Sequence, residues 1–599
     1  MVKFKLIGSA LLALAAIAVP TAALPQDAAP AAPTEIAPKT PLPNVPRNQT
    51  LVLGWSIASP IGVTNPWAVP GYTHQEGNNL MFEPLQYYAI FANKYIPWLA
   101  ESCEYTSKDF TSLEIKLNPA ATWSDGTPVT ADDVVYTFEG QMKNDKLPYH
   151  ADFQEYVDSV TAVDKETVDV KFKIPAPRFK FEVLTLKFDT GIPIVPKAWE
   201  EKQKDVNAAA GGTDIPHSGP YDLVAWNANQ KIYNLRENWW AIKAGLRSDP
   251  AVKRVVIVNL GGTVGQNMDT VAQRIVNNEM DSSLDMRAQV IGNILAQNPK
   301  VTSWTGNKSP FGYRDWWPNS LWMNTQLAPY NDVRVRKAMS LAINRDQIDQ
   351  VLYDGAHVST IYPFPLYPNL QKFADSPAVK AEEAKYNPGE YNLDKSAQLM
   401  TEAGFTKNGD GLWEKDGKTV NATINAFEGI HSDIAPVLVE MLRDGGFDAA
   451  VNFGADAQQN MNDGVPGLYL AGHGASLLDP DAALELFDGK YSSPVGAPVA
   501  GAGRYSRYKN PEYDKLLDEM APLGADDPTF QADAAKALGI YWRDVIDIPI
   551  IQWLHRIPYN NTYWTNWPSE TNLADGENGA FWAHTGMLEI TNLKPSGAK

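Results

Sequence analysis

The sequence predicts an α/β protein with more than one lobe, and three observations support this prediction. The chain has 599 residues, more than a single hydrophobic core usually supports. It contains 44% hydrophobic and 20% charged residues, which is ordinary for globular proteins. In its second half, helical patterns alternate with short apolar strands, and glycine follows several of the helices, as is typical of layered α/β domains.

The N-terminus predicts export. Lys3 and Lys5 precede an apolar run, 6–19, which is short for a membrane span, and small residues suit cleavage after Ala23. An uncleaved anchor is the alternative. The segment 1–23 contains no cysteine, so we expect no lipid anchor. Residues 24–47 are rich in Pro and Ala and are expected to form a mobile leader.

Charge and cysteine content exclude some classes of protein. The net charge of −19 argues against nucleic acid as the main partner, because binding a phosphate backbone requires clustered Lys and Arg. The single cysteine, Cys103, cannot form an internal disulfide. Its neighbours include no partner typical of a nucleophile, so we interpret it as a small buried hydrophobe.

The first half of the chain alternates strand patterns with turns. Thr50 to Trp55 is predicted to be the first strand, and a loop rich in Pro and Gly follows it to Asn79. Thr130, with Asp133 three residues later, forms a capping box that predicts a helix start. Further strands are expected at 111–117, within 157–172, and at 219–226, 231–236 and 255–260, with a helix at 270–277.

The stretch from Gly312 to Asn344 joins an aromatic segment to a helix. Pro329 prevents a helix from running through the junction, and Asn331 or Asp332 can cap the helix that follows. Its apolar residues recur at i, i+3, i+4, i+7 and i+8: Val335, Ala338, Met339, Ala342 and Ile343. Later helices are expected at 345–353, 393–403, 434–443, 510–520 and 532–546, with strands at 420–426, 449–453 and 548–554.

Five sequence blocks resemble one family. Residues 122–138, TWSDGTPVTADDVVYTF, are similar to the signature of the large extracytoplasmic solute-binding proteins of bacterial ABC importers, family 5, which bind peptides or oligosaccharides (periplasmic binding protein type 2, cluster C). Four more blocks follow in that family's order: SGPYDLVAW from Ser218, RIVNNEMD from Arg274, APYNDVRVRKAMSLAINRDQI from Ala328, and SAQLMTEAGF with DGLW from Ser396. The resemblance covers nearly the whole mature chain.

The resemblance implies a two-lobe periplasmic-binding-protein fold of type II, with an extra subdomain in lobe I. The strand 320–326 would be the last of lobe I before the crossing to lobe II. The implied layout is lobe I at 48–83, the extra subdomain at 84–217, lobe I again at 218–326, lobe II at 327–552 and the C-terminal part of lobe I at 553–599. A monomer would enclose a small-molecule ligand by hinge closure and present it to a membrane permease in the periplasm, without chemistry or cofactor.

An enzyme is the alternative of a different class. None of the eight histidines forms H-E-x-x-H or another metal-ligand spacing, so no metal site is expected. Asp479 and Asp481 flank Pro480, which is more simply a turn than a catalytic pair. An exported glycoside hydrolase stays open, because sequence spacing cannot exclude two opposed carboxylates.

The 18 tryptophans offer candidates for ligand contact. Trp239 and Trp240 match a structural aromatic position of the family and are expected in the core. Trp316 and Trp317, followed by Asn319, lie in polar company that is unusual for a core strand, and indole faces with nearby amides suit sugar rings. The remaining candidates near the N-terminus are Trp55, Trp67, His74 and Asn78.

The segment 472–480 bears on the ligand's charge. Peptide-binding relatives hold the peptide amino terminus with an Asp before an acidic-Pro turn, and here the matching position is Ser476, unless the alignment slips to Asp479. A hydroxyl cannot offset a buried ammonium. We therefore expect a neutral oligosaccharide, with a short peptide as the alternative. His473 is expected either to line the pocket or to satisfy the backbone of its loop.

Overall fold

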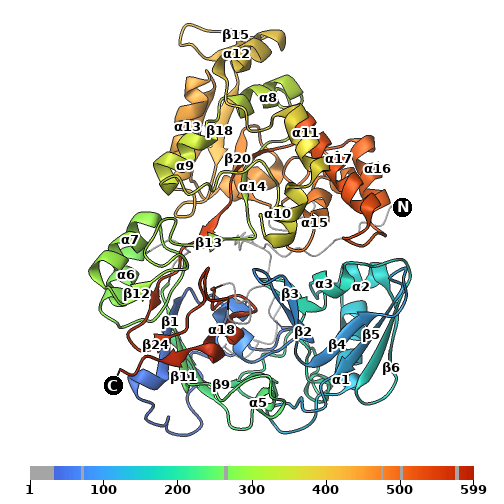
Figure 1. Ribbon diagram of the computed structural model, residues 1–599, viewed down its shortest axis with the longest axis vertical. Coiled ribbons are helices and arrows are strands. Elements are labelled where there is room, and N and C mark those ends of the chain that lie inside the picture. Colours follow the sequence, from blue (N-terminus) through green and yellow to red (C-terminus); the bar gives the residue numbers. More distant parts are fainter. Residues whose placement is uncertain are drawn as a thin grey trace, which may run out of the picture.

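The computed structural model describes residues 33–68, 73–261, 267–473, 476–499, 503–573 and 579–598. The predicted signal peptide, 1–23, and the leader up to residue 32 lie outside these ranges. Two lobes lie along the long axis of the molecule (Figure 1). Within the described ranges, no helix is both long enough and apolar enough to cross a membrane.

Lobe I is built around a four-stranded sheet in the order β1-β11-β10-β9. The first strand pairs in parallel with β11, although more than half of lobe I's chain separates them. These elements are β1 (Thr50–Trp55), β9 (Tyr221–Asn227), β10 (Gln230–Leu235), β11 (Arg254–Asn259), α5 (Trp240–Lys243), α6 (Met268–Val276), α7 (Ala288–Gln297), α18 (Gly586–Asn592), β12 (Val301–Thr302), β23 (Tyr559–Asn560), β24 (Trp564–Thr565) and β25 (Lys594–Pro595).

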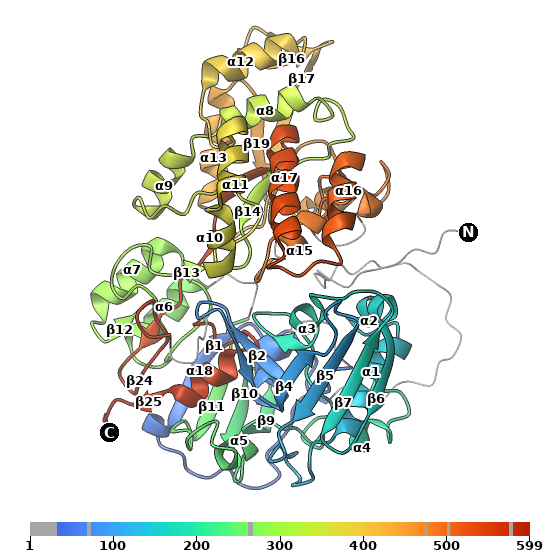
Figure 2. The ribbon, with the colours of Figure 1, turned by 45° about the vertical axis from the view of Figure 1, so that its right-hand side comes forward.

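A second part of lobe I contains the sheets β4-β5-β7-β6 and β3-β2-β8, and it lies beside the first sheet in Figure 2. The predicted capping box is confirmed, because Thr130 and Asp133 bond each other's backbone N–H groups at the start of α1. The elements are β2 (Gln86–Ala89), β3 (Lys94–Pro97), β4 (Ala100–Tyr105), β5 (Ser112–Leu117), α1 (Ala131–Lys143), α2 (His150–Tyr156), β6 (Val157–Ala162), β7 (Thr167–Phe172), α3 (Phe179–Glu182), β8 (Thr185–Leu186) and α4 (Lys197–Glu200).

Lobe II is a five-stranded sheet, β19-β18-β20-β14-β21, flanked by helices. Asp332 caps α8 as predicted, by accepting from the Arg334 N–H. The strands are β14 (Asn319–Trp322), β18 (Asn421–Asn425), β19 (Asp448–Asn452), β20 (Leu468–Gly472) and β21 (Ile548–Ile551), with β15 (Thr406–Lys407), β16 (Trp413–Lys415) and β17 (Lys418–Thr419) in a small separate sheet. The helices are α8 (Val333–Leu341), α9 (Arg345–Tyr353), α10 (Pro368–Ala374), α11 (Pro377–Tyr386), α12 (Leu393–Glu402), α13 (Ile434–Asp444), α14 (Ala457–Asp463), α15 (Asp481–Glu485), α16 (Pro511–Met520) and α17 (Pro528–Asp544).

The strand expected to close lobe I lies instead in lobe II. Leu321 in β14 pairs with Leu470 of β20 and with Ile548 of β21, and it packs in the lobe II core. The crossing therefore comes before Asn319, earlier than the expected boundary at 327. An apolar strand pattern indicates that a strand is buried, but it does not indicate in which sheet. The other expected boundaries stay predictions.

The second half of the expected mobile leader is held against lobe I. Ile36 exchanges two backbone hydrogen bonds with Trp226, the penultimate residue of β9, at 2.6 and 3.0 Å. Arg47 forms an ion pair with the buried Asp281 at 2.8 Å. Residues 33–47 thus gain tertiary hydrogen bonds that their Pro-rich composition does not indicate.

Glu83 is the centre of an indole cluster in the core of lobe I. Its carboxylate accepts hydrogen bonds from the Nε1 atoms of Trp98, Trp239 and Trp240 at 2.9, 3.2 and 2.7 Å. All four side chains are buried. The core role expected for the Trp239-Trp240 pair agrees with this arrangement.

Candidate functional site

Within the residues that the structure describes, the chain crosses between the lobes twice, and the two crossings run side by side. β13 (Tyr313–Arg314) pairs antiparallel with β22 (Leu554–His555), and the Asp315 N–H donates to the Trp553 carbonyl at 2.8 Å. Figure 1 places β13 at the lobe boundary. Trp316 and Trp317 follow directly, so these two indoles lie on the crossing itself, immediately before the lobe II strand β14.

Aromatic rings of lobe I form a continuous layer toward this crossing. Trp55 stacks on Trp582 with ring centroids 4.9 Å apart, and Trp582 meets His555 edge to face at 5.6 Å. Phe188 stacks on His555 at 5.8 Å and on Trp316 at 6.1 Å. Five aromatic side chains from five separate chain segments are thereby brought together, and Trp316 remains partly exposed.

A smaller aromatic group continues the layer on the lobe II side. Trp317 stacks on His431 at 6.0 Å and meets Trp553 edge to face at 6.3 Å. The buried Asn319 orients the group, because its Oδ1 lies 2.8 Å from His431 Nε2 and its Nδ2 donates to the Trp317 carbonyl at 2.8 Å. Burial lowers the pKa of His431 to about 3, so this ring is neutral at physiological pH.

Ionised groups reinforce the crossing. His555 Nδ1 lies 2.5 Å from Asp285 Oδ2, and His555 Nε2 lies 3.1 Å from Asp315 Oδ1. Burial lowers the pKa of His555, but the two carboxylates outweigh this effect and raise the pKa well above its usual value. The imidazolium therefore ties β22 to both carboxylates.

A stacked pair of histidines, His74 and His584, adjoins Phe188. The rings of His74 and His584 stack at 3.8 Å, and His74 Nε2 lies 2.8 Å from Asp189 Oδ1. The His584 N–H donates to the Phe188 carbonyl at 2.7 Å. His74 is thus placed next to the lobe I ring layer, as a candidate ligand residue requires, and its ligand contact stays a prediction.

Three lobe II candidates already have partners within the protein. His473 Nε2 lies 2.7 Å from Asp547, and the ring packs 4.7 Å from Trp322. Ser476 Oγ accepts from the Ala483 N–H at 2.9 Å. Asp479 forms an ion pair with Arg178 of lobe I at 3.0 Å. Each of these groups thus already has a partner within the protein, and its ligand contact stays a prediction.

Two other candidates contribute to packing in lobe I. Trp67 stacks on Tyr136 of α1 at 5.5 Å, and it covers Gly140, where an added Cβ would lie 2.4 Å from the indole. Asn78 is buried and donates to the Thr64 carbonyl at 3.0 Å. Neither contacts the aromatic layer at the crossing in the described contacts, so their ligand role remains an expectation from the sequence.

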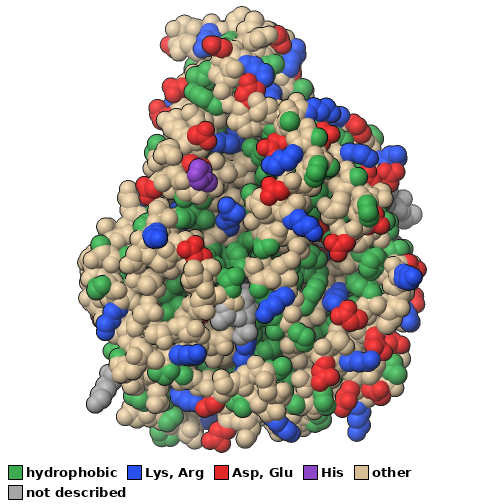
Figure 3. All heavy atoms as spheres, in the orientation of Figure 1, with side chains coloured by type: hydrophobic (Ala, Val, Ile, Leu, Met, Phe, Trp, Pro, Cys, Tyr) green, Lys and Arg blue, Asp and Glu red, His purple; other side chains and the backbone are tan. Residues whose placement is uncertain are grey.

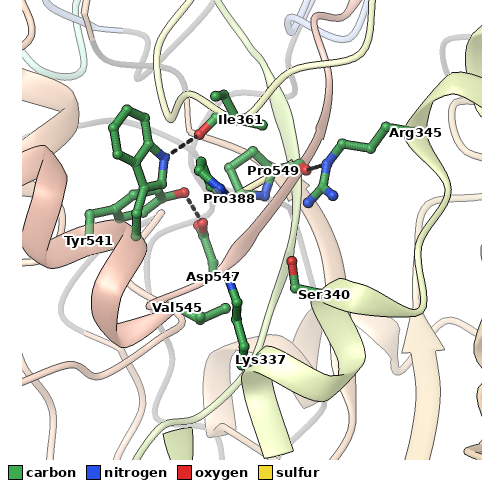
Figure 4. A pocket seen from close by; sticks show the side chains of 10 residues that line it. Lys337, Ser340, Arg345, Ile361, Pro388, Tyr541, Val545, Asp547 and Pro549 are labelled. Atoms are coloured by element: carbon green, nitrogen blue, oxygen red, sulfur yellow. Dashed lines mark hydrogen bonds between the residues drawn. The ribbon is translucent and has the colours of Figure 1, made fainter. Parts of the chain in front are cut away.

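Two cavities lie within single lobes. The cavity in Figure 4, lined by Arg345, Tyr541 and Asp547 of lobe II, has a volume of about 10 Å³, which suits one water molecule. A groove of about 340 Å³ on lobe I is lined by hydroxyl and amide side chains around Trp304 and Trp567. In the described part of the chain, no group of three or more His, Cys, Asp or Glu residues is arranged to hold a metal ion.

Charges of both signs are interspersed on the face shown in Figure 3. No single-sign patch on that face marks a polyanion-binding surface. The aromatic layer at the crossing is accordingly the feature of the described residues that best suits a small solute.

Sequence reasoning missed several members of this layer. Phe188, His431, Trp553, His555 and Trp582 were not predicted as site residues, although the C-terminal tail is visibly rich in Trp. The sequence around 553–555 is rich in aromatic and apolar residues, which could have marked it as part of the site. The sequence does not show, however, that β22 pairs with β13 at the crossing.

Comparisons with known proteins agree with the two-lobe architecture. Residues 94–494 match the family model described as "Bacterial extracellular solute-binding proteins, family 5 Middle". The periplasmic oligopeptide-binding protein OppA of Salmonella typhimurium is 23% identical over 484 residues, covering 77% of this chain and 79% of that protein.

Solved structures extend the likeness over most of the chain. A periplasmic oligopeptide-binding protein of an ABC transporter from Thermotoga maritima, solved with mannohexaose bound, is 25% identical, with a TM-score of 0.75 and coverage of 92% of this chain and 100% of that one. The oligopeptide-binding protein AppA of Bacillus subtilis, solved with a nonapeptide, shares the fold at 19% identity and a TM-score of 0.67, covering 91% of this chain and 98% of that one.

The expected type II fold is confirmed by these structures, and the expectation of a binding protein rather than an enzyme is confirmed by the family match. The match spans more than half of the chain, and all five sequence blocks lie within residues 94–494. This chain belongs to family 5 of the bacterial extracellular solute-binding proteins.

Proposed function

We propose that this protein captures a neutral oligosaccharide between its two lobes and delivers it to the membrane permease of an ABC importer. The observation that carries the proposal is the aromatic layer at the inter-lobe crossing, with Trp316 and Trp317 at its centre. Indole faces stack on the C–H faces of sugar rings, and nearby amides and carboxylates bond hydroxyl groups. Both indoles are partly exposed and belong to the segment that must move when the lobes close.

The charge of lobe II supports a neutral ligand. Asp479, the carboxylate best placed in sequence to receive a peptide ammonium, is paired with Arg178 at 3.0 Å. Ser476 carries no charge and is bonded to the backbone of α15. A peptide amino terminus held there would have to displace Arg178 and leave a guanidinium without its partner, which is costly in a shielded site.

The relatives support both ligand classes. The Thermotoga maritima structure holds mannohexaose, which favours an oligosaccharide here. The Salmonella typhimurium relative is named for oligopeptides, so a short peptide is the second candidate. Periplasmic location, a cleaved signal peptide, a monomeric state and the permease partner are also inferred, from the N-terminal pattern and from the family.

The test is a calorimetric and thermal-shift screen of the full-length mature protein. Mannohexaose and manno- and gluco-configured di- to tetrasaccharides are compared with di- to pentapeptides. A ligand at about 100 times its Kd stabilises the folded state by about 2.7 kcal/mol, which gives a clear shift in Tm. Stabilisation by saccharides and not by peptides is expected. Stabilisation by peptides alone would overturn the oligosaccharide assignment but leave the family assignment intact.

A further inference from the structure

Arg178 of lobe I reaches across the lobe boundary. Its Nε atom lies 3.0 Å from Asp479 Oδ2 and 3.2 Å from Asp481 Oδ2, both in lobe II. The three side chains are only 13%, 7% and 17% exposed, so water and salt screen the ion pair weakly. Figure 2 shows α3 and α15, which these residues adjoin, facing each other across the boundary on the side away from β13.

The same side chain contacts two more segments of lobe II. Arg178 Nη1 donates to the Leu523 carbonyl, just after α16, at 3.2 Å. The guanidinium carbon lies 4.5 Å from the ring centroid of Phe530 in α17. In the opposite direction, Leu477 of lobe II is buried in the hydrophobic cluster of lobe I. The two surfaces therefore interlock, and these contacts can form only when the lobes are together.

Acidic side chains surround this ion pair from both lobes. They are Asp152 and Glu155 of α2 and Glu182 of α3 on the lobe I side, and Asp479, Asp481 and Glu485 on the lobe II side. Two lysines each lie near one of these carboxylates: the buried Lys187 lies 3.7 Å from Glu182, and Lys490 lies 3.2 Å from Glu485. Without Arg178, closure would bring two acidic surfaces together, and like charges repel at this distance.

We propose that Arg178 is a positioning residue for solute capture: it holds lobe II against lobe I through Asp479 and Asp481, and it maintains a closed population without solute. Every group in these contacts belongs to the protein, so their contribution does not depend on the ligand. A solute then binds lobes that are already partly closed, and less of its binding free energy is spent on closing them. This inference rests on the proposed function in one respect: it assumes that closing the lobes captures a solute.

The test measures the distance between the lobes directly, without any saccharide. Nitroxide labels are placed at the exposed positions Asp145, after α1, and Asp518, in α16, through Asp145→Cys and Asp518→Cys. Cys103 is fully buried and does not react. Pulsed dipolar spectroscopy of the ligand-free wild type is expected to show a short-distance population. Arg178→Met should lower the ratio of closed to open molecules at least about tenfold.

Conservative and control variants separate a cross-lobe role from a general structural one. Arg178→Lys should give an intermediate closed fraction, because it keeps the charge but loses the planar fork of donors. Asp479→Asn with Asp481→Asn should lower the closed fraction in the wild type but raise it in the Arg178→Met background, because there the two carboxylates only repel the acidic groups of lobe I. Arg47→Met removes a shielded ion pair within lobe I; it should lower Tm and leave the distances unchanged.

The dependence of the closed fraction on pH distinguishes an electrostatic role from packing, because packing contacts alone would not change with pH. Burial raises the pKa of Asp481 to about 7; Arg178 opposes the shift, and Asp479, Glu485 and Glu182 add to it. Burial, with a contribution from Glu485, also raises the pKa of Asp152 to about 7. In open lobes both groups return to water and toward 3.8, so the closed form binds more protons. The closed fraction should rise as the pH is lowered from about 8 to about 6.

Three results would each overturn the proposal. They are the absence of a short-distance population in the wild type, an unchanged population in Arg178→Met, and an equal loss in Arg47→Met. A closed fraction that does not change with pH would also contradict it, because the acidic groups would then be in the same environment in both states. None of these outcomes bears on whether the solute is a saccharide.

Discussion

At the scale of single residues, Trp316 and Trp317 have different neighbours although they are adjacent in sequence. Trp316 stacks on Phe188 of lobe I, whereas Trp317 stacks on His431 of lobe II and lies over Gly472, where an added Cβ would lie 2.2 Å from the indole. The chain bends at Trp316, between β13 and β14. One indole therefore serves each lobe, and a solute between the lobes can contact both.

The double variant Trp316→Ala with Trp317→Ala should weaken saccharide binding by more than about tenfold, because each lost stacking face is worth about 1 kcal/mol or more. Isothermal titration with mannohexaose measures the change. The fold should remain intact, since both side chains are only partly buried. Trp199→Ala is the matched control, a half-exposed indole in α4 away from the crossing. If the double variant and this control bound mannohexaose with equal affinity, both indoles would serve packing and not ligand binding.

Glu83 is a residue-scale determinant of stability. Glu83→Ala leaves three buried indole N–H groups without an acceptor, and removing one partner of such a network costs about 3–5 kcal/mol. The midpoint of chemical denaturation should fall accordingly, whereas Glu101→Ala, at an exposed position of β4, should change stability by less than about 0.5 kcal/mol. If both variants unfolded at the same denaturant concentration, the carboxylate would have no role in holding the indoles.

At the scale of elements, the paired strands β13 and β22 concentrate ionised groups at the crossing. His555 is held between Asp285, which precedes α7, and Asp315, which follows β13. Such short strands have few ladder hydrogen bonds of their own. The ion pairs supplement them at the point where the chain has to bend during closure.

His555 predicts a pH dependence of stability. Because its folded pKa is raised above the unfolded value of 6.5, the stabilisation is fully present below pH 6.5 and is lost as the pH rises through the folded pKa. His555→Asn should lower the free energy of unfolding by about 3 kcal/mol below that pH, with a smaller difference in more alkaline solution.

Urea unfolding of both proteins across the pH range measures this difference. His357→Asn, an exposed position in lobe II where Asn suits the positive φ of 55°, is the control and should track the wild type. A deficit of His555→Asn that stays constant from acid to alkaline pH would show that the imidazole acts by packing rather than by charge.

At the scale of the whole molecule, separate cores and few connections make lobe movement possible. Leu321 and Ile548 belong to the lobe II core, whereas Tyr313 and Ile557 belong to the lobe I core, so each crossing has only a few residues between cores. Elsewhere the lobes are joined by the ion pair of Arg178 with Asp479 and by Leu477 of lobe II, which packs in the lobe I core. A protein built in this way can open by breaking a few boundary contacts while most of each apolar core stays intact.

Local sequence patterns by themselves determined several secondary-structure elements and helix caps of this protein. The strand at 50–55, the capping box at Thr130, the cap at Asp332 and the helix at 345–353 were predicted and are confirmed. These features depend on residues within one or two turns of each other, and caps and periodicity report them directly. The order of five family blocks likewise indicated the family and the fold.

Only the tertiary structure decided which distant segments meet. It showed that β14 belongs to the lobe II sheet, that Ile36 pairs with β9, and that Arg178 contacts Asp479, which lies 301 positions away. It also joined rings from positions 55, 188, 316, 555 and 582 into one layer. Such contacts depend on strand pairing and on the closure of long loops, and periodicity in one segment carries no information about its distant partner.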